Sequence, residues 1–111
     1  MIPARYREDE KIIAHTIEQI KKDFDRHLPK LVFSGNPAIV FEELKVQVST
    51  ALKIIYSQDR LSFKPLLYKI DIREPDMTYI SFEELAEKVI HREFKKVLTR
   101  KFYSKNSPGK K

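Results

Sequence analysis

Cysteine is absent from this chain of 111 residues, and glycine occurs only at Gly35 and Gly109. Without cysteine there is no disulfide, no thiolate metal site and no cysteine nucleophile. So little glycine disfavours folds with many tight hairpin turns, such as β-barrels and β-sandwiches. No apolar run approaches the ~20 residues that cross a bilayer, and no signal-peptide pattern opens the sequence. We therefore expect a cytoplasmic protein.

The composition is that of one small globular domain. Hydrophobic residues make up 41% of the chain and charged residues 34%, which is typical of a folded chain rather than a disordered one. A chain of 111 residues suits a single core. We assign residues 1–103 to this domain. Residues 104–111 contain no apolar side chain and are expected to form a disordered basic tail.

The positive charge is concentrated near the C-terminus. The formal net charge is +6, from 22 Lys and Arg against 16 Asp and Glu. Residues 88–111 hold nine of the basic residues and one acid, Glu93, so this quarter carries +8 and the remainder −2. Such asymmetry bears on partners and solubility rather than on the fold.

Apolar residues recur with helical spacing in four segments. The spacing predicts helices over 8–26, 37–56, 59–70 and 82–102. The second is apolar around most of its circumference, which is typical of a buried helix, and we expect it at the centre of the fold. Three long helices and one short one predict an all-α fold, a compact antiparallel bundle of about four helices.

Local signals indicate where these helices begin. Asn36 followed by Pro37 is a typical helix start, with an Asx cap and proline in the first turn. Ser81 and Glu84 match the capping box, in which each side chain bonds the other residue's main chain. The third helix has two alternative starts, because a start at Ser62 places Pro65 in the first turn, whereas a start at Asp59 implies a kink. The apolar Leu31–Phe33 triplet is expected to pack onto the core as a loop or short helical turn.

No catalytic constellation is apparent in the sequence. The three histidines, at positions 15, 27 and 91, share no helical turn, and no phosphate-binding loop or metalloprotease motif occurs. Glu87 and His91 are spaced i, i+4, which is more typical of a surface pair than of a metal site. The acidic residues Asp71, Glu74 and Asp76 lack the pattern of a calcium loop. We expect no enzyme activity, no cofactor and no metal.

The most informative feature is a basic stripe on the last predicted helix. Four of its cations lie opposite the apolar face, and three more continue toward the tail. A helix with such a stripe is able to follow a phosphate backbone. The alternative is an ordinary solvated face, with cations favoured near the helix C-terminus. The candidate residues for binding nucleic acid or another anionic partner are Lys88, Arg92, Lys95, Lys96, Arg100, Lys101 and Lys105.

The segment from Leu66 to Glu74 reads Leu-Leu-Tyr-Lys-Ile-Asp-Ile-Arg-Glu. It resembles a segment that precedes the last helix in a group of small uncharacterised bacterial all-helical proteins. The resemblance implies the fold class alone and transfers no activity or site residue. In this segment we expect Tyr68 and Ile70 to anchor the helix end and Asp71 to cap the following turn.

Taken together, these patterns predict a non-catalytic helical binding or adaptor protein. Its expected partner is another protein or a second copy of the chain, for which the surplus apolar residues at Leu31–Phe33 and around Val46 are candidates. The alternative is a nucleic-acid-binding protein that uses the basic stripe. The sequence does not identify a specific biological role.

Overall fold

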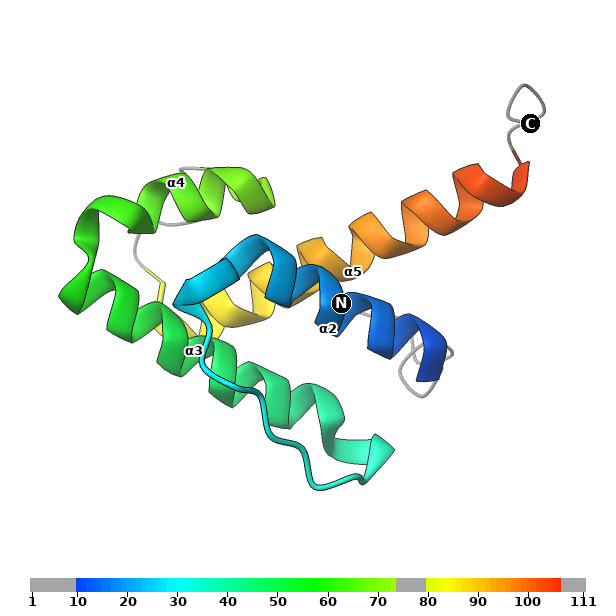
Figure 1. The fold of residues 1–111 in the computed structure, drawn as a ribbon, viewed down its shortest axis with the longest axis horizontal. Coiled ribbons are helices and arrows are strands. Elements are labelled where there is room, and N and C mark those ends of the chain that lie inside the picture. Colours follow the sequence, from blue (N-terminus) through cyan, green and yellow to red (C-terminus); the bar gives the residue numbers. More distant parts are fainter. Residues whose placement is uncertain (1–9, 74–79, 107–111) are drawn as a thin grey trace.

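The computed structural model describes residues 10–73 and 80–106, with side chains up to Arg100. Within these ranges the chain is all-α and contains no strand, so the predicted fold class is confirmed. Four α-helices pack together, and two short 3-10 helices accompany them (Figure 1). The elements are α2 (Glu10–Phe24), η1 (Asp25–His27), η2 (Pro37–Ile39), α3 (Val40–Gln58), α4 (Arg60–Ile70) and α5 (Phe82–Asn106).

The long helix α5 is the centre of the packing. It contacts α3 and α2 most extensively and α4 to a smaller extent. The prediction that α3 is the central helix is wrong, because α3 buries one face only. Leu44, Val48 and Leu52 are fully buried, whereas Val46 and Ile54 on the other side are exposed. The outer face of α3 therefore meets solvent.

The predicted helix starts are confirmed at Asn36 and Ser81. The Asn36 side chain accepts a hydrogen bond from the Ala38 amide at 3.0 Å, and the chain then passes through η2 into α3. At the start of α5, the Glu84 amide donates to Ser81 Oγ at 3.1 Å, and the Ser81 amide donates to Glu84 Oε1 at 3.0 Å. This reciprocal pair satisfies two amides that the helix itself leaves unbonded.

A single residue, Asp59, joins α3 to α4. Its amide donates to the Ile55 carbonyl at 2.8 Å, and its carboxylate accepts from the Ser62 hydroxyl at 2.8 Å. The helix α4 begins at Arg60, so Pro65 lies in its interior rather than in its first turn. Proline has no N–H to bond the Leu61 carbonyl one turn earlier, and Leu61 itself is 90% exposed.

The core is continuous across all four helices. Phe24 of α2, Leu52 of α3, Leu67 of α4 and Phe94 of α5 are each at most 1% exposed and belong to one cluster. Of the triplet predicted to pack onto the core, Leu31 and Phe33 do so from the connection between α2 and α3, whereas Val32 is 68% exposed. No helix in the described ranges is long and apolar enough to cross a membrane.

The ends of α4 and α5 differ from the prediction. The buried Ile70 anchors the end of α4, whereas Tyr68 is 53% exposed. The helix α5 ends at Asn106 rather than at Phe102, so residues 104–106 are helical. The remainder of the predicted tail, 107–111, lies outside the described residues.

Candidate anion-binding site

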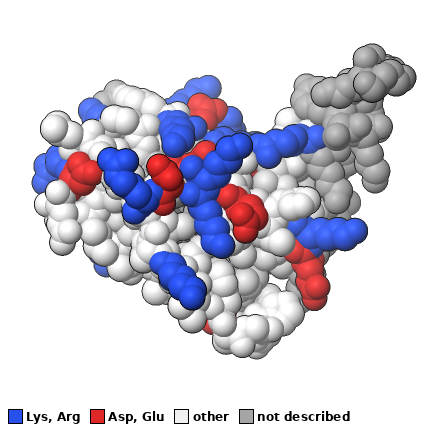
Figure 2. All heavy atoms as spheres, viewed as in Figure 1, with Lys and Arg blue, Asp and Glu red and all other residues white. Residues whose placement is uncertain are grey.

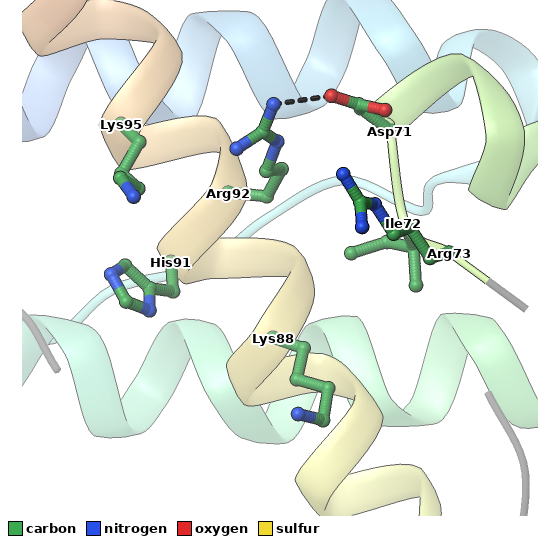
Figure 3. A pocket seen from close by; sticks show the side chains of 7 residues that line it. All are labelled: Asp71, Ile72, Arg73, Lys88, His91, Arg92 and Lys95. Carbon is green, nitrogen blue, oxygen red and sulfur yellow. Dashed lines mark hydrogen bonds and ion pairs between the residues drawn. The ribbon is translucent and has the colours of Figure 1, made fainter. Parts of the chain in front are cut away.

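Basic side chains of α5 and the segment after α4 together line a pocket of about 370 Å³ (Figure 3). Lys88, His91, Arg92 and Lys95 are spaced i, i+3, i+4 and i+7, which places them on one face of the helix. The other wall is the segment that follows α4. We call this space the basic pocket; it is lined by Asp71, Ile72, Arg73, Lys88, His91, Arg92 and Lys95.

The way α4 ends positions the second wall. Asp71 adopts a left-handed backbone, with φ of 78°. Its amide donates to the Tyr68 carbonyl at 3.0 Å, and the Ile72 amide donates to the Leu67 carbonyl at 2.8 Å. These two bonds form a Schellman ending, which turns the chain sharply away from the helix axis. Ile72 is buried against the core, so Asp71 and Arg73 on either side of it are directed to the surface beside α5 (Figure 3).

The pocket carries a positive excess. Arg73, Lys88, Arg92 and Lys95 supply four cations, and Asp71 supplies one carboxylate, which is ion-paired with Arg92 Nη2. The prediction that Asp71 caps the turn after the helix is therefore only partly confirmed. Its backbone ends the helix, but its side chain holds the Arg92 guanidinium at the rim of the pocket.

His91 is a neutral member of this cationic group. Partial burial, together with the charges of Lys95, Arg92 and Lys88, lowers the pKa of His91 below its ordinary value. At neutral pH the imidazole therefore has one N–H to donate and one nitrogen to accept. Its predicted partner Glu87 lies 3.8 Å from Lys45 of α3, so that carboxylate faces another helix.

Two other cations of the predicted stripe contact α2 instead of the pocket. Lys96 Nζ donates to Asp23 Oδ2 at 3.0 Å and lies 3.3 Å from Glu93 Oε1. Arg100 donates to Gln19 Oε1 at 2.9 Å. A second hollow of about 320 Å³ continues along α5 from Arg92 to Arg100, with both of these side chains in its lining. The side chains of Lys101 and Lys105 lie outside the described part of the structure.

The contact between α2 and α5 is a buried acidic pair that the sequence analysis missed. Glu93 is 0% exposed and Asp23 is 7% exposed. Burial and the adjacent Asp23 carboxylate raise the pKa of Glu93 to about 8. Burial acts on Asp23 in the same direction, but hydrogen bonds from Glu93, Lys96 and Gln19 outweigh it and lower the pKa of Asp23.

These shifts assign the protons of the cluster at neutral pH. As a carboxylate, Glu93 finds no hydrogen-bond donor of good geometry among the described residues. As a carboxylic acid it donates to Asp23, which also accepts from Lys96 and from Gln19 Nε2 at 3.1 Å. The cluster then holds one carboxylate and one ammonium and is neutral, as a buried group is expected to be. The sequence held one indication that Glu93 is buried, because it lies four residues from both Val89 and Val97 and so on the apolar face of the helix.

The fold does not bring the other histidines and the acidic cluster considered in the sequence analysis together into a site. His15 is exposed on α2, and His27 lies 3.8 Å from Asp59. Glu74 and Asp76 of the acidic cluster are outside the described residues. Within the described part of the chain, no three His, Cys, Asp or Glu side chains are placed to hold a metal ion.

The surface charge is mixed rather than uniformly basic. Figure 2 shows Lys and Arg side chains gathered over one face of the molecule, with acidic side chains among them. The basic pocket is thus a local concentration of positive charge. Comparisons of the chain with protein families, curated proteins and solved structures find no match.

Proposed function

We propose that this chain is a non-catalytic binding protein that holds a nucleic acid by its phosphates in the basic pocket. The observation that carries the proposal is that four cations from two segments line one hollow, with one carboxylate among the described lining residues. A solvated helix face gives cations along one helix only. Here Arg73 comes from the segment after α4 and lines the same hollow as Lys88 and Lys95 of α5 (Figure 3).

The chemistry of the lining suits a phosphate oxygen. Arginine presents a planar fork of N–H donors that matches phosphate, and lysine contributes a compact charge. Neutral His91 adds a hydrogen-bond donor, and because it carries no charge it does not repel the cations around it. Most contacts between proteins and nucleic acids are of this kind, because phosphate contacts supply the affinity that is independent of sequence.

The test is a salt titration of labelled duplex DNA and single-stranded RNA. The pocket variant is Lys88→Gln/Lys95→Gln. The matched control is Lys30→Gln/Lys53→Gln, which removes the same charge from two exposed positions that line neither hollow. On duplex DNA the pocket variant is expected to reduce the slope of log K against log salt by about two, at ~0.9 per phosphate.

Two outcomes would contradict the proposal. Equal slopes for the pocket variant and the control would show that net charge, not the pocket, determines binding. No binding at ~50 mM salt, where non-specific contacts are strong, would leave the pocket a solvated surface.

Self-association is a second candidate, favoured by exposed apolar side chains. Val32 is 68% exposed and Val46 63% exposed. The Gln47 side chain bonds the amide and the carbonyl of Val32, each at 2.8 Å, so the loop bearing Val32 is fixed beside α3. A second copy of the chain would cover these residues. Sedimentation equilibrium of the wild type and Val46→Glu tests this, and a monomeric wild type at high concentration would exclude it.

A further inference from the structure

We infer that two copies of this chain associate by pairing residues 30–34 of one copy with residues 30–34 of the other, as two antiparallel β-strands. This inference rests on the self-association proposed above, to which it gives a surface and a geometry, and it does not depend on the binding of nucleic acid. It follows from the backbone of this segment, from its unbonded main-chain groups and from the symmetry of the pairing. We call residues 30–34 the edge segment.

The edge segment has the side-chain alternation of a β-strand. Leu31 and Phe33 pack against the core, whereas Val32 is 68% exposed and Ser34 is also exposed. Side chains that point in turn to two opposite faces are typical of extended backbone. Figure 1 shows the segment, in cyan, running beside α3 at the rim of the molecule. One edge of the extended chain therefore lies toward α3, and the other lies away from it.

The main chain of the segment is bonded on the side of α3 only. The Gln47 side chain bonds the amide and the carbonyl of Val32, each at 2.8 Å. In extended backbone the N–H and C=O groups of successive residues alternate between the two edges, so those of Leu31 and Phe33 point away from α3. The main chain of these two residues makes no hydrogen bond to the described residues. The segment thus presents a fixed strand edge that is ready to pair with another chain.

The open edge is short. Pro29 has no amide hydrogen, and Gly35 adopts a left-handed backbone with φ of 95°, so neither residue continues a regular ladder. The main-chain bonds of the pairing are therefore limited to Leu31 and Phe33. A small interface of this kind gives a weak dimer that depends on concentration, rather than an obligate one.

A second copy of the chain fits this edge because the pairing is symmetric. When a two-fold axis passes beside Val32, Leu31 of each copy lies opposite Phe33 of the other. Both residues of such a pair exchange N–H···O=C bonds, so the open groups of both edges are satisfied. The two Val32 residues form the non-hydrogen-bonded pair between them, in which side chains approach most closely. The exposed valine is then covered by the same residue of the second copy.

The charges beside the edge are complementary in the same register. Lys30 of one copy lies opposite Ser34 of the other, and the Ser34 amide donates to Glu43 Oε2 at 3.0 Å. Glu43 Oε1 has no hydrogen-bond partner among the described residues. The pairing brings the exposed Lys30 ammonium toward this carboxylate, once on each side of the axis. An unrelated extended peptide would bond the main chain but would not by itself supply this cation, so the observations favour a second copy.

The experiment places charges at the two-fold axis and measures association by sedimentation equilibrium over a series of concentrations, with protein free of nucleic acid. The variants are Val32→Glu and Val32→Lys, each alone and both mixed in equal amounts. The matched controls are Leu61→Glu and Leu61→Lys, at a residue of α4 that is 90% exposed. Circular dichroism checks that every variant keeps its helices, as expected for changes at exposed positions.

The wild type is expected to dimerise reversibly. Each Val32 variant alone should associate about tenfold more weakly, because two like charges then lie directly opposite each other. The mixture of Val32→Glu and Val32→Lys should regain the lost association, because opposite charges then face each other across the axis. The Leu61 variants should associate as the wild type does, both alone and mixed.

Three outcomes would overturn the inference. If the wild type dimerises and the Val32 variants do so equally well, another surface carries the interface and self-association itself stands. If each Val32 variant loses association and the mixture does not regain it, Val32 does not lie opposite itself and the symmetric pairing is wrong. A wild type that stays monomeric would overturn both the pairing and the self-association, and would leave the edge to an extended segment of a different protein.

Discussion

Lys95 and Lys96 are neighbours on α5, yet they belong to two different surfaces. Lys95 is exposed and lines the basic pocket, whereas the Lys96 side chain is 24% exposed and bonded to Asp23. Both are the same residue type in the same helix, so neither propensity nor local charge separates them. The difference arises because α2 places a buried carboxylate beside one and not beside the other. The helix that packs against a basic face therefore determines which of its cations are paired and which remain at the surface.

The largest expected effect tests the buried side of this comparison. The unfolded chain releases the Glu93 proton near pH 4.5, and the folded chain releases it only near about 8. Because the folded state retains the proton between these values, folding becomes less favourable as the pH rises through that window. We expect Glu93→Gln to match the wild type at pH 5 and to exceed its stability at pH 8, on the order of 3 kcal/mol.

Urea unfolding at a series of pH values measures this effect. The control is Glu87→Gln, an exposed acid on the same helix, which should keep the pH dependence of the wild type. Parallel curves for the wild type and Glu93→Gln would show that Glu93 is ionised in the folded state at neutral pH, and the proton assignment would be wrong.

The second prediction compares the two lysines directly. Lys96→Met leaves Asp23 buried without its ammonium partner, which should lower the free energy of unfolding. Gln19 and Glu93 still donate to Asp23, so we expect the decrease to be limited to about 2 kcal/mol. Lys95→Met should change the free energy of unfolding by less than about 0.5 kcal/mol, as is usual at an exposed position. Denaturant unfolding of both variants measures the difference. Similar losses in the two would remove the distinction between the two surfaces.

The smallest predicted effect concerns the one carboxylate in the basic pocket. Asp71→Asn removes the charge, and asparagine tolerates the left-handed backbone that ends α4. An exposed ion pair contributes little to stability, so the fold should be unaffected. Binding of DNA should tighten about threefold, because a repulsive charge is removed and Arg92 is released. Glu42→Gln, exposed on α3, is the control of equal charge, and equal gains in both variants would exclude a local role for Asp71.

The sequence predicted those features that depend on nearby residues. Ser81 and Glu84 of the capping box are three positions apart, and Asn36 and its partner Ala38 are two apart, so both could be identified from spacing. The apolar face of α5 followed from periodicity. These interactions are completed within one or two turns of the chain, and helix geometry alone determines them.

The rest depends on contacts between distant residues. Asp23 and Lys96 are 73 positions apart, and the stripe could not be divided without knowing which helix covers it. Arg73 was not included in the predicted site because it lies outside the last helix, and only the turn at Asp71 brings it to the pocket. Pro65 shows a third limit, since local signals left a start at Ser62 and a start at Asp59 both open, and the one-residue joint at Asp59 sets the start of α4 at Arg60.

The central position of α5 has a consequence for how the protein is made. It is the last of the four helices in chain order, so α2, α3 and α4 leave the ribosome before the helix that covers their apolar faces. Until residues 82–106 emerge, the nascent chain exposes the side chains that later form its core. Such intermediates are prone to aggregate and are typical clients of chaperones. We expect the whole domain to acquire protease resistance in one step, once residues 82–106 have emerged, rather than helix by helix.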